Sequence, residues 1–515
     1  MTTKNTFYSR HLRLLAVAVL VIALGAAAPG ASVADAASPI KATLTDGQNW
    51  TGAGAGTGGE ILLAQGRKAS RGKKKPKRRA MSSSRKSPAR KGRTLAPAAE
   101  SLPWPDNVKA LAGSGAVLVV DHHAAGGEPS ELISLNPDRD YVPASILKLV
   151  TSAVALYSLG PGYRFRTGFY LDRNGDLWIK GYGDPYLVSE ELCNVADQLR
   201  FSGLTRARDI RVDDSFFEEG VVGDGVTFTR NPYDAYTSAF GVNFNTVSFL
   251  IDRKAGMVEL NECTPLTPMT RDIAAKSRGE GGGRTRGKRR NSRQRAAGET
   301  VLNISESPRA AETNGAEVIR ELLVRRGVEM EGGVFVGGQV PSDARLIYEH
   351  SSTQTLQDML TVLLKYSNNY MTNQIFLTMG AEKYGTPGNF EKGRRVVQDF
   401  LDLYRLPGLT LVEGSGLSRN NHLTARQMAE VLRVMEPARS IIKSDSDGTV
   451  YYKTGTMTNV QTLAGYIERP GRPDEPLSFV ILLNGKYEPG TRNRILSALK
   501  AHLVDGGNEV ETGRG

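Results

Sequence analysis

The sequence predicts an α/β (α+β) fold, in which an antiparallel sheet covered by helices is interrupted by an inserted β-rich accessory region. Three observations lead to this prediction. An apolar, central helix comes early, at residues 143–160. Short strand-like segments and turns then continue to about residue 251. Helical periodicity returns strongly at 355–379, and a final group of strands follows between 449 and 484.

The first 100 residues are predicted to be an export signal followed by a disordered linker. Three basic residues precede an apolar stretch at 14–28, and Ala34-Asp35-Ala36 offers a cleavage site. Residues 1–36 therefore predict an exported protein of the periplasm or another extracytoplasmic part of the cell envelope. Because the apolar stretch has 15 residues and a membrane span needs roughly 20, an uncleaved anchor is the alternative. Residues 37–100 are poor in aromatic side chains and rich in Gly, Ser, Lys, Arg and Pro, which is typical of disorder.

Positive charge is concentrated in this linker. Between Arg67 and Arg93 there are 14 Lys and Arg and no acidic residue. The whole chain carries +12 and residues 1–100 carry +14, which leaves −2 for residues 101–515. We therefore expect the basic tail to contact an anionic wall polymer or membrane surface, and no specific nucleic acid. A solvated spacer without a partner is the alternative.

The ordered chain is predicted to begin near residue 102 with helices and strands mixed. A short helix is followed by two strands, at 106–111, 116–121 and 131–135. After the apolar helix, a hairpin pattern surrounds Asn174-Gly175, with strands at 164–171 and 177–180. The middle region continues with strand-like pieces and turns. A strand is then predicted at 301–304, a helix at 314–326 and a further strand at 333–336.

The C-terminal part alternates between helices and strands. Helical periodicity covers 355–379 and 389–404. Thr424 and Gln427 form the capping-box pattern of a further helix that ends near residue 435. Three strand patterns and a closing helix follow, at 449–453, 462–468, 477–484 and 492–503.

Two features of the middle region bear on its chemistry. The segment from Lys276 to Arg295 holds nine Lys and Arg against Glu280, has no apolar periodicity and is expected to be an exposed basic loop. Cys193 and Cys263 are the two cysteines of the chain. In an exported protein they form either one disulfide or two buried free thiols, and the sequence favours neither.

Ser145 and Lys148 are the first candidate catalytic pair. Lys148 is the only charged side chain between Tyr141 and Tyr163, and a buried cation is costly unless it is paired or used. Ser145 lies one helical turn earlier on the same face, and a hydroxyl beside a desolvated amine makes an activated nucleophile. The spacing S-x-x-K is weak by itself, because it also begins at Ser38, Ser70, Ser83, Ser440 and Ser497.

Two later motifs select this copy. Ser367-Asn368-Asn369 is an S-x-N motif inside a stretch that is predicted to be helical, and Lys453-Thr454-Gly455 is a K-T-G motif on a predicted strand. The order S-x-x-K, S-x-N, K-T-G is the signature of the acyl-serine enzymes that react with β-lactams. Each motif is weak alone, whereas the three in this order are a specific signal.

With these motifs, the chain resembles the class C low-molecular-mass penicillin-binding proteins, the D-alanyl-D-alanine carboxypeptidase/endopeptidase family. The resemblance runs from about residue 115 to 485 and is carried by PASILKL, GYGDPYL, DDSFF, KYSNNYMTNQIF, GSGLSRNNHLTARQM and KTGTMTNVQTLAGYI. The 218 residues between Lys148 and Ser367 also fit, because this family inserts whole domains where a class A β-lactamase has a small helical subdomain.

The resemblance implies a transpeptidase domain like that of penicillin-binding proteins and serine β-lactamases, divided in the sequence. We expect its two parts at 101–163 and 346–515. The insertion at 164–345 is expected to form one or two β-rich accessory domains that carry the basic loop at 276–295.

The resemblance also implies the catalytic roles. Ser145 would attack the carbonyl between the last two D-alanines of a peptidoglycan stem peptide and become acylated. Lys148, neutral through burial, would take the Ser145 proton, although the acylation base is disputed among related enzymes. Ser367 would pass a proton to the leaving amine. The backbone N–H groups of Ser145 and Thr456 would form the oxyanion hole.

The remaining site residues are expected to bind substrate. Asn369 would hydrogen-bond the peptide backbone of the substrate. Lys453, with the hydroxyls of Thr454 and Thr456, would hold the terminal carboxylate. The expected activity is therefore a serine-type D-Ala-D-Ala carboxypeptidase, with endopeptidase activity as an addition, and β-lactam antibiotics as covalent inhibitors.

Two departures and two alternatives accompany this prediction. Glu413 stands where relatives usually carry Asp before the GSGLS loop, and the basic segment at 276–295 has no match in the family. A serine β-lactamase or esterase on the same fold is disfavoured by the long insertion and by the lack of a Glu-x-x-x-Asn motif after Ser367. A non-catalytic cell-wall-binding protein is disfavoured by the three intact motifs.

No metal or organic cofactor is expected. The six histidines form no H-E-x-x-H motif, and two distant cysteines do not make a zinc site. The sequence does not distinguish carboxypeptidase from endopeptidase activity, and it leaves the stem-peptide preference and the oligomeric state undetermined.

Overall fold

The structure is a computed structural model that describes residues 105, 107–252, 256–280, 299–304 and 307–505. The predicted signal at 1–36, the linker at 37–100 and residues 281–298 of the predicted basic loop lie outside these residues. Among the described helices, none combines the length and apolar character needed to cross a bilayer.

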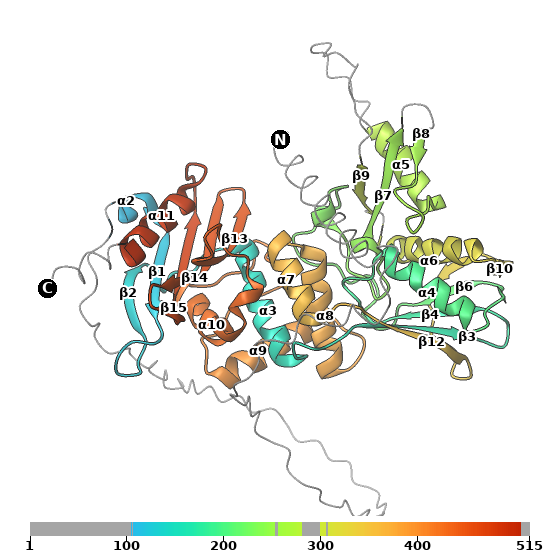
Figure 1. Ribbon diagram of the computed structural model, residues 1–515, viewed down its shortest axis with the longest axis horizontal. Coiled ribbons are helices and arrows are strands. Elements are labelled where there is room, and N and C mark those ends of the chain that lie inside the picture. Colours follow the sequence, from blue (N-terminus) through green and yellow to red (C-terminus); the bar gives the residue numbers. More distant parts are fainter. Residues whose placement is uncertain (1–104, 106, 253–255, 281–298, 305–306, 506–515) are drawn as a thin grey trace, which may run out of the picture. The chain divides into compact units, whose positions relative to one another are not determined.

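The first sheet has five antiparallel strands in the order β13-β14-β15-β1-β2 (Figure 1). Its strands come from both ends of the described chain: β1 (Ala116–Asp121), β2 (Ser130–Leu135), β13 (Val450–Met457), β14 (Val460–Arg469) and β15 (Arg472–Asn484). β1 pairs with β15 so that Val119 faces Phe479. The predicted antiparallel sheet and its predicted strands are thereby confirmed.

Helices cover both faces of this sheet, which explains why β1 is buried along its whole length. On one face, apolar side chains of α2 (Val108–Ala112) and α11 (Thr491–Lys500) share a core with Val117, Phe479 and Ile481. The π-helical turn Ala501–Asp505 continues α11. On the other face, α10 (Ala425–Met435) contacts β1 and β15. The capping box of Thr424 and Gln427 is present at the start of α10, as predicted.

A layer of helices surrounds α3 (Leu147–Ser158), which follows the 3₁₀ turn η1 (Ala144–Ile146). α3 contacts α7 (Leu356–Tyr366), α8 (Asn369–Tyr384), α9 (Phe390–Tyr404) and α10. Because α3 has neighbours on so many sides, its residues from Leu147 to Ala155 are all buried. This explains why the sequence of the helix is apolar on nearly every side. The 3₁₀ turn η4 (Glu436–Ile441) continues α10.

The predicted continuous helix at 355–379 is wrong in one respect. The chain leaves α7 at Ser367, whose φ of 57° lies in the left-handed region, and α8 begins at Asn369. The side chain of Asn368 accepts a hydrogen bond from Met371 N and caps α8. The S-x-N motif therefore lies at a junction between two helices and not within one.

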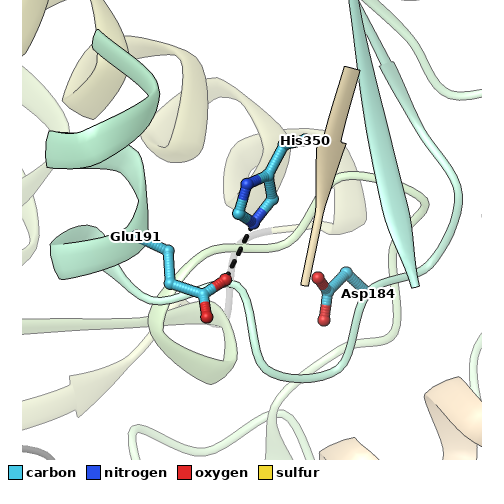
Figure 2. Close-up of side chains that lie close together, drawn as sticks. All are labelled: Asp184, Glu191 and His350. Atoms are coloured by element: carbon cyan, nitrogen blue, oxygen red, sulfur yellow. Dashed lines mark hydrogen bonds and ion pairs between the residues drawn. The ribbon is translucent and has the colours of Figure 1, made fainter. Parts of the chain in front are cut away.

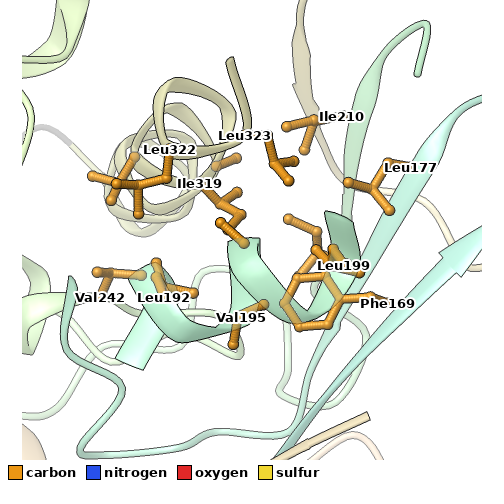
Figure 3. Close-up of a cluster of buried hydrophobic side chains, with 14 of the residues drawn as sticks. Phe169, Leu177, Leu192, Val195, Leu199, Ile210, Val242, Ile319, Leu322 and Leu323 are labelled. Carbon is orange, nitrogen blue, oxygen red and sulfur yellow. The ribbon is translucent and has the colours of Figure 1, made fainter. Parts of the chain in front are cut away.

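The second sheet has the order β11-β6-β4-β3-β12. Its strands are β3 (Arg166–Leu171), β4 (Leu177–Gly181), β6 (Ile210–Asp213), β11 (Val334–Val336) and β12 (Arg345–Ser351). Two helices, α4 (Ser189–Phe201) and α6 (Pro308–Arg325), share a core with it. Figure 3 shows Leu192 and Leu199 of α4 turned toward Ile319 of α6 and Phe169 of β3.

Helix α4 was not predicted, although its sequence carries a signal. Its buried apolar residues follow the helical spacing i, i+3, i+4, i+7, namely Leu192, Val195, Ala196 and Leu199. The segment up to residue 251, which was predicted to hold only strand-like pieces and turns, therefore also contains a helix. Its remaining short elements are β5 (Arg206–Ala207), β10 (Glu329–Met330) and the 3₁₀ turns η2 (Pro232–Asp234) and η3 (Asn243–Asn245).

A third, three-stranded sheet has the order β8-β7-β9 and packs against α5 (Pro268–Glu280). Its strands are β7 (Thr246–Asp252), β8 (Gly256–Val258) and β9 (Glu299–Asn303). Cys193 of α4 and Cys263 form a disulfide, which decides between the two alternatives left by the sequence. Residues 276–280 end α5, so the first part of the predicted basic loop is helical.

Candidate active site

Ser145 and Lys148 meet at the start of α3. Ser145 lies in η1 and is half-buried, whereas Lys148 lies in the first turn of α3 and is fully buried. The Lys148 Nζ donates a hydrogen bond to Ser145 Oγ across 3.1 Å. The hydroxyl is thus reachable from solvent while its neighbouring amine is shielded from it.

Burial changes the proton affinity of this lysine. It lowers the pKa of Lys148 to about 7, and the negative charge of Glu413 opposes part of that effect. A neutral amine is therefore accessible near neutral pH. A lysine of this kind can take a proton from the serine, which an ordinary surface lysine cannot do.

The S-x-N motif reaches the same lysine. Lys148 Nζ also donates to Asn369 Oδ1 across 2.7 Å and to the carbonyl of Ser415 across 2.6 Å. The Asn369 Nδ2 donates to the carbonyl of Tyr233, in the 3₁₀ turn η2, across 3.1 Å. Asn369 therefore connects the lysine with the inserted region of the chain.

Ser367 donates or accepts no side-chain hydrogen bond among the described bonds of Lys148. It is half-buried at the end of α7, two residues before Asn369. The acceptors of the described Lys148 hydrogen bonds are Ser145, Asn369 and Ser415, and Ser367 is not among them. Its left-handed backbone ends the helix, and the new helix starts with Asn369 next to the lysine.

The K-T-G strand lies directly against the nucleophile's backbone. A Cβ atom at position 455 would lie 2.8 Å from the Pro143 carbonyl oxygen and 2.9 Å from Ser145 N. Only glycine allows β13 to approach this closely. Thr462 Oγ1, on the neighbouring strand β14, donates to the Pro143 carbonyl across 2.6 Å and fixes the turn in which Ser145 lies.

Lys453 lies on β13 and is buried beside two other cationic groups. Burial lowers the pKa of Lys453 well below its ordinary value, and the charges of Lys148 and Arg492 add to this. Its Nζ donates to the carbonyl of Thr454 across 2.8 Å. A carboxylate bound here would favour the charged form of Lys453, because an opposite charge raises the pKa of an amine. Thr454 is half-buried and Thr456 is exposed.

Arg492 is a residue of this site that the sequence analysis missed. It lies in the first turn of α11 and donates to Thr456 Oγ1 across 2.7 Å and to the carbonyl of Gly455. No motif surrounds it, and its partners lie 36 and 37 residues earlier in the chain. It adds a guanidinium to the end of β13 at which a carboxylate is expected.

Glu413, the departure from the family pattern, holds the GSGLS loop in place. It is fully buried, and its carboxylate accepts hydrogen bonds from five groups: Asn373 Nδ2, Ser415 N, Ser415 Oγ, Ser418 N and Asn421 Nδ2. The loop in turn presents the Ser415 carbonyl to Lys148. Glu413 therefore fixes the loop whose carbonyl accepts a hydrogen bond from Lys148, and it supplies a negative charge near that lysine.

Ala144, immediately before the nucleophile, has a strained backbone. Its φ is 49°, in the left-handed region that residues with a Cβ rarely adopt. Gly416 packs so closely on the Ala144 carbonyl that a Cβ atom at position 416 would overlap it. Strain of this kind is found at functional sites, where the surrounding structure maintains it. No pattern in the sequence predicts this strained backbone.

Comparison with known proteins points to one family. The model of the D-Ala-D-Ala carboxypeptidase 3 (S13) family matches residues 109–441. A D-alanyl-D-alanine carboxypeptidase from Actinomadura sp. (strain R39) is 29% identical over 432 residues, which cover 72% of this chain and 78% of that protein. The penicillin-sensitive carboxypeptidase A of Dictyostelium discoideum is 23% identical over 450 residues, covering 71% of this chain and 82% of that protein.

A solved structure shows the same fold. Penicillin-binding protein 4 (dacB) from Haemophilus influenzae superposes with a TM-score of 0.61 at 20% sequence identity. The similarity covers 78% of this chain and 99% of that protein. The similarity in fold therefore extends over nearly the whole length of the related structure.

Proposed function

The chain belongs to the D-Ala-D-Ala carboxypeptidase 3 (S13) family, and we propose that its serine-type carboxypeptidase reaction proceeds through an acyl-enzyme on Ser145. The observation that supports this most directly is the hydrogen bond between the buried Lys148 Nζ and Ser145 Oγ. A nucleophile is activated by a base within hydrogen-bond distance, and here burial makes the base neutral near pH 7.

In the proposed first step, Ser145 Oγ attacks the carbonyl carbon of the penultimate D-alanine of a peptidoglycan stem peptide. The Ser145 proton passes to Lys148, and the carbonyl oxygen becomes an oxyanion held by the N–H groups of Ser145 and Thr456. The close packing of β13 on the Ser145 backbone supports this pair of donors. Loss of one such donor costs about 3–4 kcal/mol in other acyl-transfer enzymes.

In the proposed second step, the C–N bond breaks and the terminal D-alanine leaves with a proton. Ser367 is the proposed relay for this proton, and Lys148 is its source. Water then attacks the ester carbonyl and releases the shortened stem peptide with Ser145 regenerated. Lys148 takes a proton from that water and passes it to Ser145 Oγ as the ester bond breaks, because the base of one half-reaction is the acid of the other.

Substrate binding is proposed to use two groups of residues, one on β13 and the other at the start of α8. Lys453, Thr454 and Thr456 would hold the terminal carboxylate, with Arg492 behind them. Asn369 would offer its Nδ2 to the substrate backbone in exchange for the Tyr233 carbonyl that accepts from it here. β-Lactams would acylate the same serine. A structure of the related protein from Haemophilus influenzae, at 20% identity, is described as complexed with a β-lactam.

The proposal also assigns a role to each part of the chain. Residues 101–163 and 346–515 would form the catalytic part and 164–345 the accessory part. The pairing of β12 with β3 up to Ser351 supports a second boundary that follows β12. Residues 1–36 would direct export to the periplasm or an equivalent compartment, where peptidoglycan lies, and the basic linker would contact anionic wall polymer or membrane.

The test is acylation by a fluorescent penicillin, followed on gels and by intact mass. We expect one stable adduct per chain, which Ser145→Ala abolishes. Ser152→Ala is the matched control, because Ser152 lies on the same helix, is buried, and its Oγ has no partner among the described residues. Release of D-alanine from a stem pentapeptide, and cleavage of a cross-linked dimer, then separate carboxypeptidase from endopeptidase activity.

Each contrary outcome has a defined meaning. Rapid turnover of the penicillin would identify a β-lactamase on the same fold. An adduct that persists in Ser145→Ala would remove Ser145 from the mechanism. A folded wild-type protein without adduct and without D-alanine release would overturn the proposed function.

A further inference from the structure

Three buried side chains from separate elements converge away from the catalytic serine (Figure 2). Asp184 follows β4, Glu191 lies in the first turn of α4, and His350 lies on β12. Each contributes one potential ligand atom, and these atoms lie within 4.8 Å of one another. All three residues are buried, at 3%, 6% and 5% exposure. The motif GYGDPYL, which the catalytic mechanism does not use, contributes Asp184.

Each carboxylate is oriented by a donor on one oxygen, which leaves the other oxygen for the cluster. The Tyr186 N–H donates to Asp184 Oδ1 across 2.8 Å. The Thr353 N–H donates to Glu191 Oε1 across 3.3 Å, and the Thr353 hydroxyl donates to the same oxygen. Metal-binding side chains are commonly fixed by such outer hydrogen bonds.

The oxygens turned inward are not equally satisfied. Glu191 Oε2 and His350 Nε2 are 2.8 Å apart. Asp184 Oδ2 is buried and has no hydrogen-bond partner among the described residues. In Figure 2 the Asp184 carboxylate points toward the space beside Glu191 and His350. An unpartnered buried carboxylate oxygen is costly, and a cation bound beside it would remove that cost.

Charge gives a second reason to expect a cation. Two carboxyl groups converge with one imidazole in a site shielded from water, and carboxylates held so close together repel each other. A divalent cation would neutralise them and would use the free oxygen of Asp184. The His350–Glu191 hydrogen bond would open to admit it, since the ion would lie between these two groups.

We propose that Asp184, Glu191 and His350 bind a divalent metal ion of the zinc type. One imidazole nitrogen and two carboxylate oxygens suit zinc, which binds such atoms at about 2.0–2.2 Å and completes its coordination with water. Calcium and magnesium prefer oxygen ligands alone, so the imidazole disfavours them. The ion would join the end of β4, α4 and β12, and the chain passes from β12 directly into α7. Its role would be to stabilise the accessory sheet against the helix that ends at Ser367.

The test measures zinc on the untagged chain after treatment with a chelator and dialysis. We expect one zinc per chain by elemental analysis, binding in a calorimetric titration, and a melting temperature several degrees higher with zinc than without. Asp184→Asn should lower the affinity at least tenfold and remove most of the thermal shift. Calcium and magnesium should give no comparable shift.

The matched control is the His123–Glu436 pair, which has the same Nε2–carboxylate distance of 2.8 Å and is not part of a described three-residue cluster. His123→Gln should leave zinc binding unchanged. Penicillin acylation of each variant reports whether the protein is folded, since none of these residues belongs to the catalytic site. Substoichiometric zinc in the wild type, or equal zinc binding by a folded Asp184→Asn variant, would overturn the proposal.

Discussion

Lys148 donates hydrogen bonds to Ser145, Asn369 and Ser415, so all three of its protons have an acceptor. The charged form is therefore fully hydrogen-bonded although the side chain is fully buried. Burial still dominates and lowers its pKa to about 7. The balance between hydrogen bonding and desolvation leaves a lysine that changes charge near neutral pH.

This balance predicts the pH dependence of acylation. Below the lowered pKa, Lys148 is protonated and cannot accept the Ser145 proton, so the acylation rate should fall with decreasing pH, with a midpoint near 7. Stopped-flow measurement of penicillin acylation from pH 5 to 9 checks this. In Glu413→Gln the midpoint should move to lower pH, because the Glu413 charge raises the pKa of Lys148. An acylation rate that does not change between pH 5 and 9 would contradict a base with this lowered pKa.

Arg492 predicts a second effect at the scale of single residues. Its guanidinium is bonded to Thr456 Oγ1 and to the Gly455 carbonyl, beside the expected carboxylate position. Charged hydrogen bonds contribute about 1.5–3 kcal/mol, so Arg492→Ala should reduce the second-order acylation rate about 10- to 100-fold. The loss should be smaller for a β-lactam whose carboxylate is esterified.

Arg494→Ala is the control for this substitution. Arg494 lies on the same helix, is exposed, and donates to Thr491 Oγ1 and not to β13. It should leave the acylation rate within twofold of the wild type. If Arg492→Ala reduced the acylation rate equally for the free acid and for the ester, Arg492 would only hold β13 in position.

At this scale the sequence predicted the members of the motifs and not their supports. Ser145, Lys148 and Asn369 were found because three motifs occur in a fixed order, and the structure brings these three side chains into contact. Arg492 and the five-donor role of Glu413 depend on contacts between residues that are distant in the sequence. Such contacts leave no local pattern, so only the folded chain reveals them.

Among the elements, β13 is the one whose position determines the site. Its Gly455 lies so close to Ser145 N and the Pro143 carbonyl that any side chain would push the strand away. The sequence predicted a strand here, at 449–453, and β13 covers Val450–Met457. The closeness of two backbones could not be predicted, because it follows from how β13 and β14 pack on η1.

Gly455→Ala is therefore expected to impair acylation strongly. The added methyl group would separate β13 from η1 and displace both Lys453 and the Thr456 N–H, so the rate should fall at least 100-fold. Gly408→Ala is the control, because a Cβ atom there would meet nothing within 4 Å. Circular dichroism and melting curves show whether the variant is folded. Near-normal acylation by folded Gly455→Ala would contradict the close approach.

The helices show what local patterns can and cannot predict. The capping box of Thr424 and Gln427 fixed the start of α10 correctly, because a cap is a local interaction. The break at Ser367 was missed, because apolar periodicity continues through it and the left-handed residue is not a glycine. Helix α4 was missed although its apolar spacing was present, since the surrounding strand-like segments suggested continuity.

In the molecule as a whole, the inserted region contributes to the catalytic site through loops. Tyr233 accepts from Asn369, and Asp224 accepts from Ser418 and Asn420 beside the GSGLS loop. The insertion is thus not a separate appendage, because its loops hydrogen-bond two segments that surround Lys148. The sequence predicted an inserted region, but it could not predict hydrogen bonds between loops that are distant in the chain.

The disulfide tests whether the stability of the inserted region affects the geometry of the catalytic site. Cys193 and Cys263 are 70 residues apart, and closing a loop of this length stabilises a protein by about 4 kcal/mol in the chain-entropy account. The double variant Cys193→Ser, Cys263→Ser should therefore unfold at lower denaturant concentration, while its penicillin acylation rate in the absence of denaturant stays within twofold. Reductant should destabilise the wild type and leave the double variant unchanged, which serves as the control. If acylation fell in parallel with stability, the accessory loops would set the geometry of Asn369 and Lys148; if it did not, the catalytic sheet and α3 maintain that geometry alone.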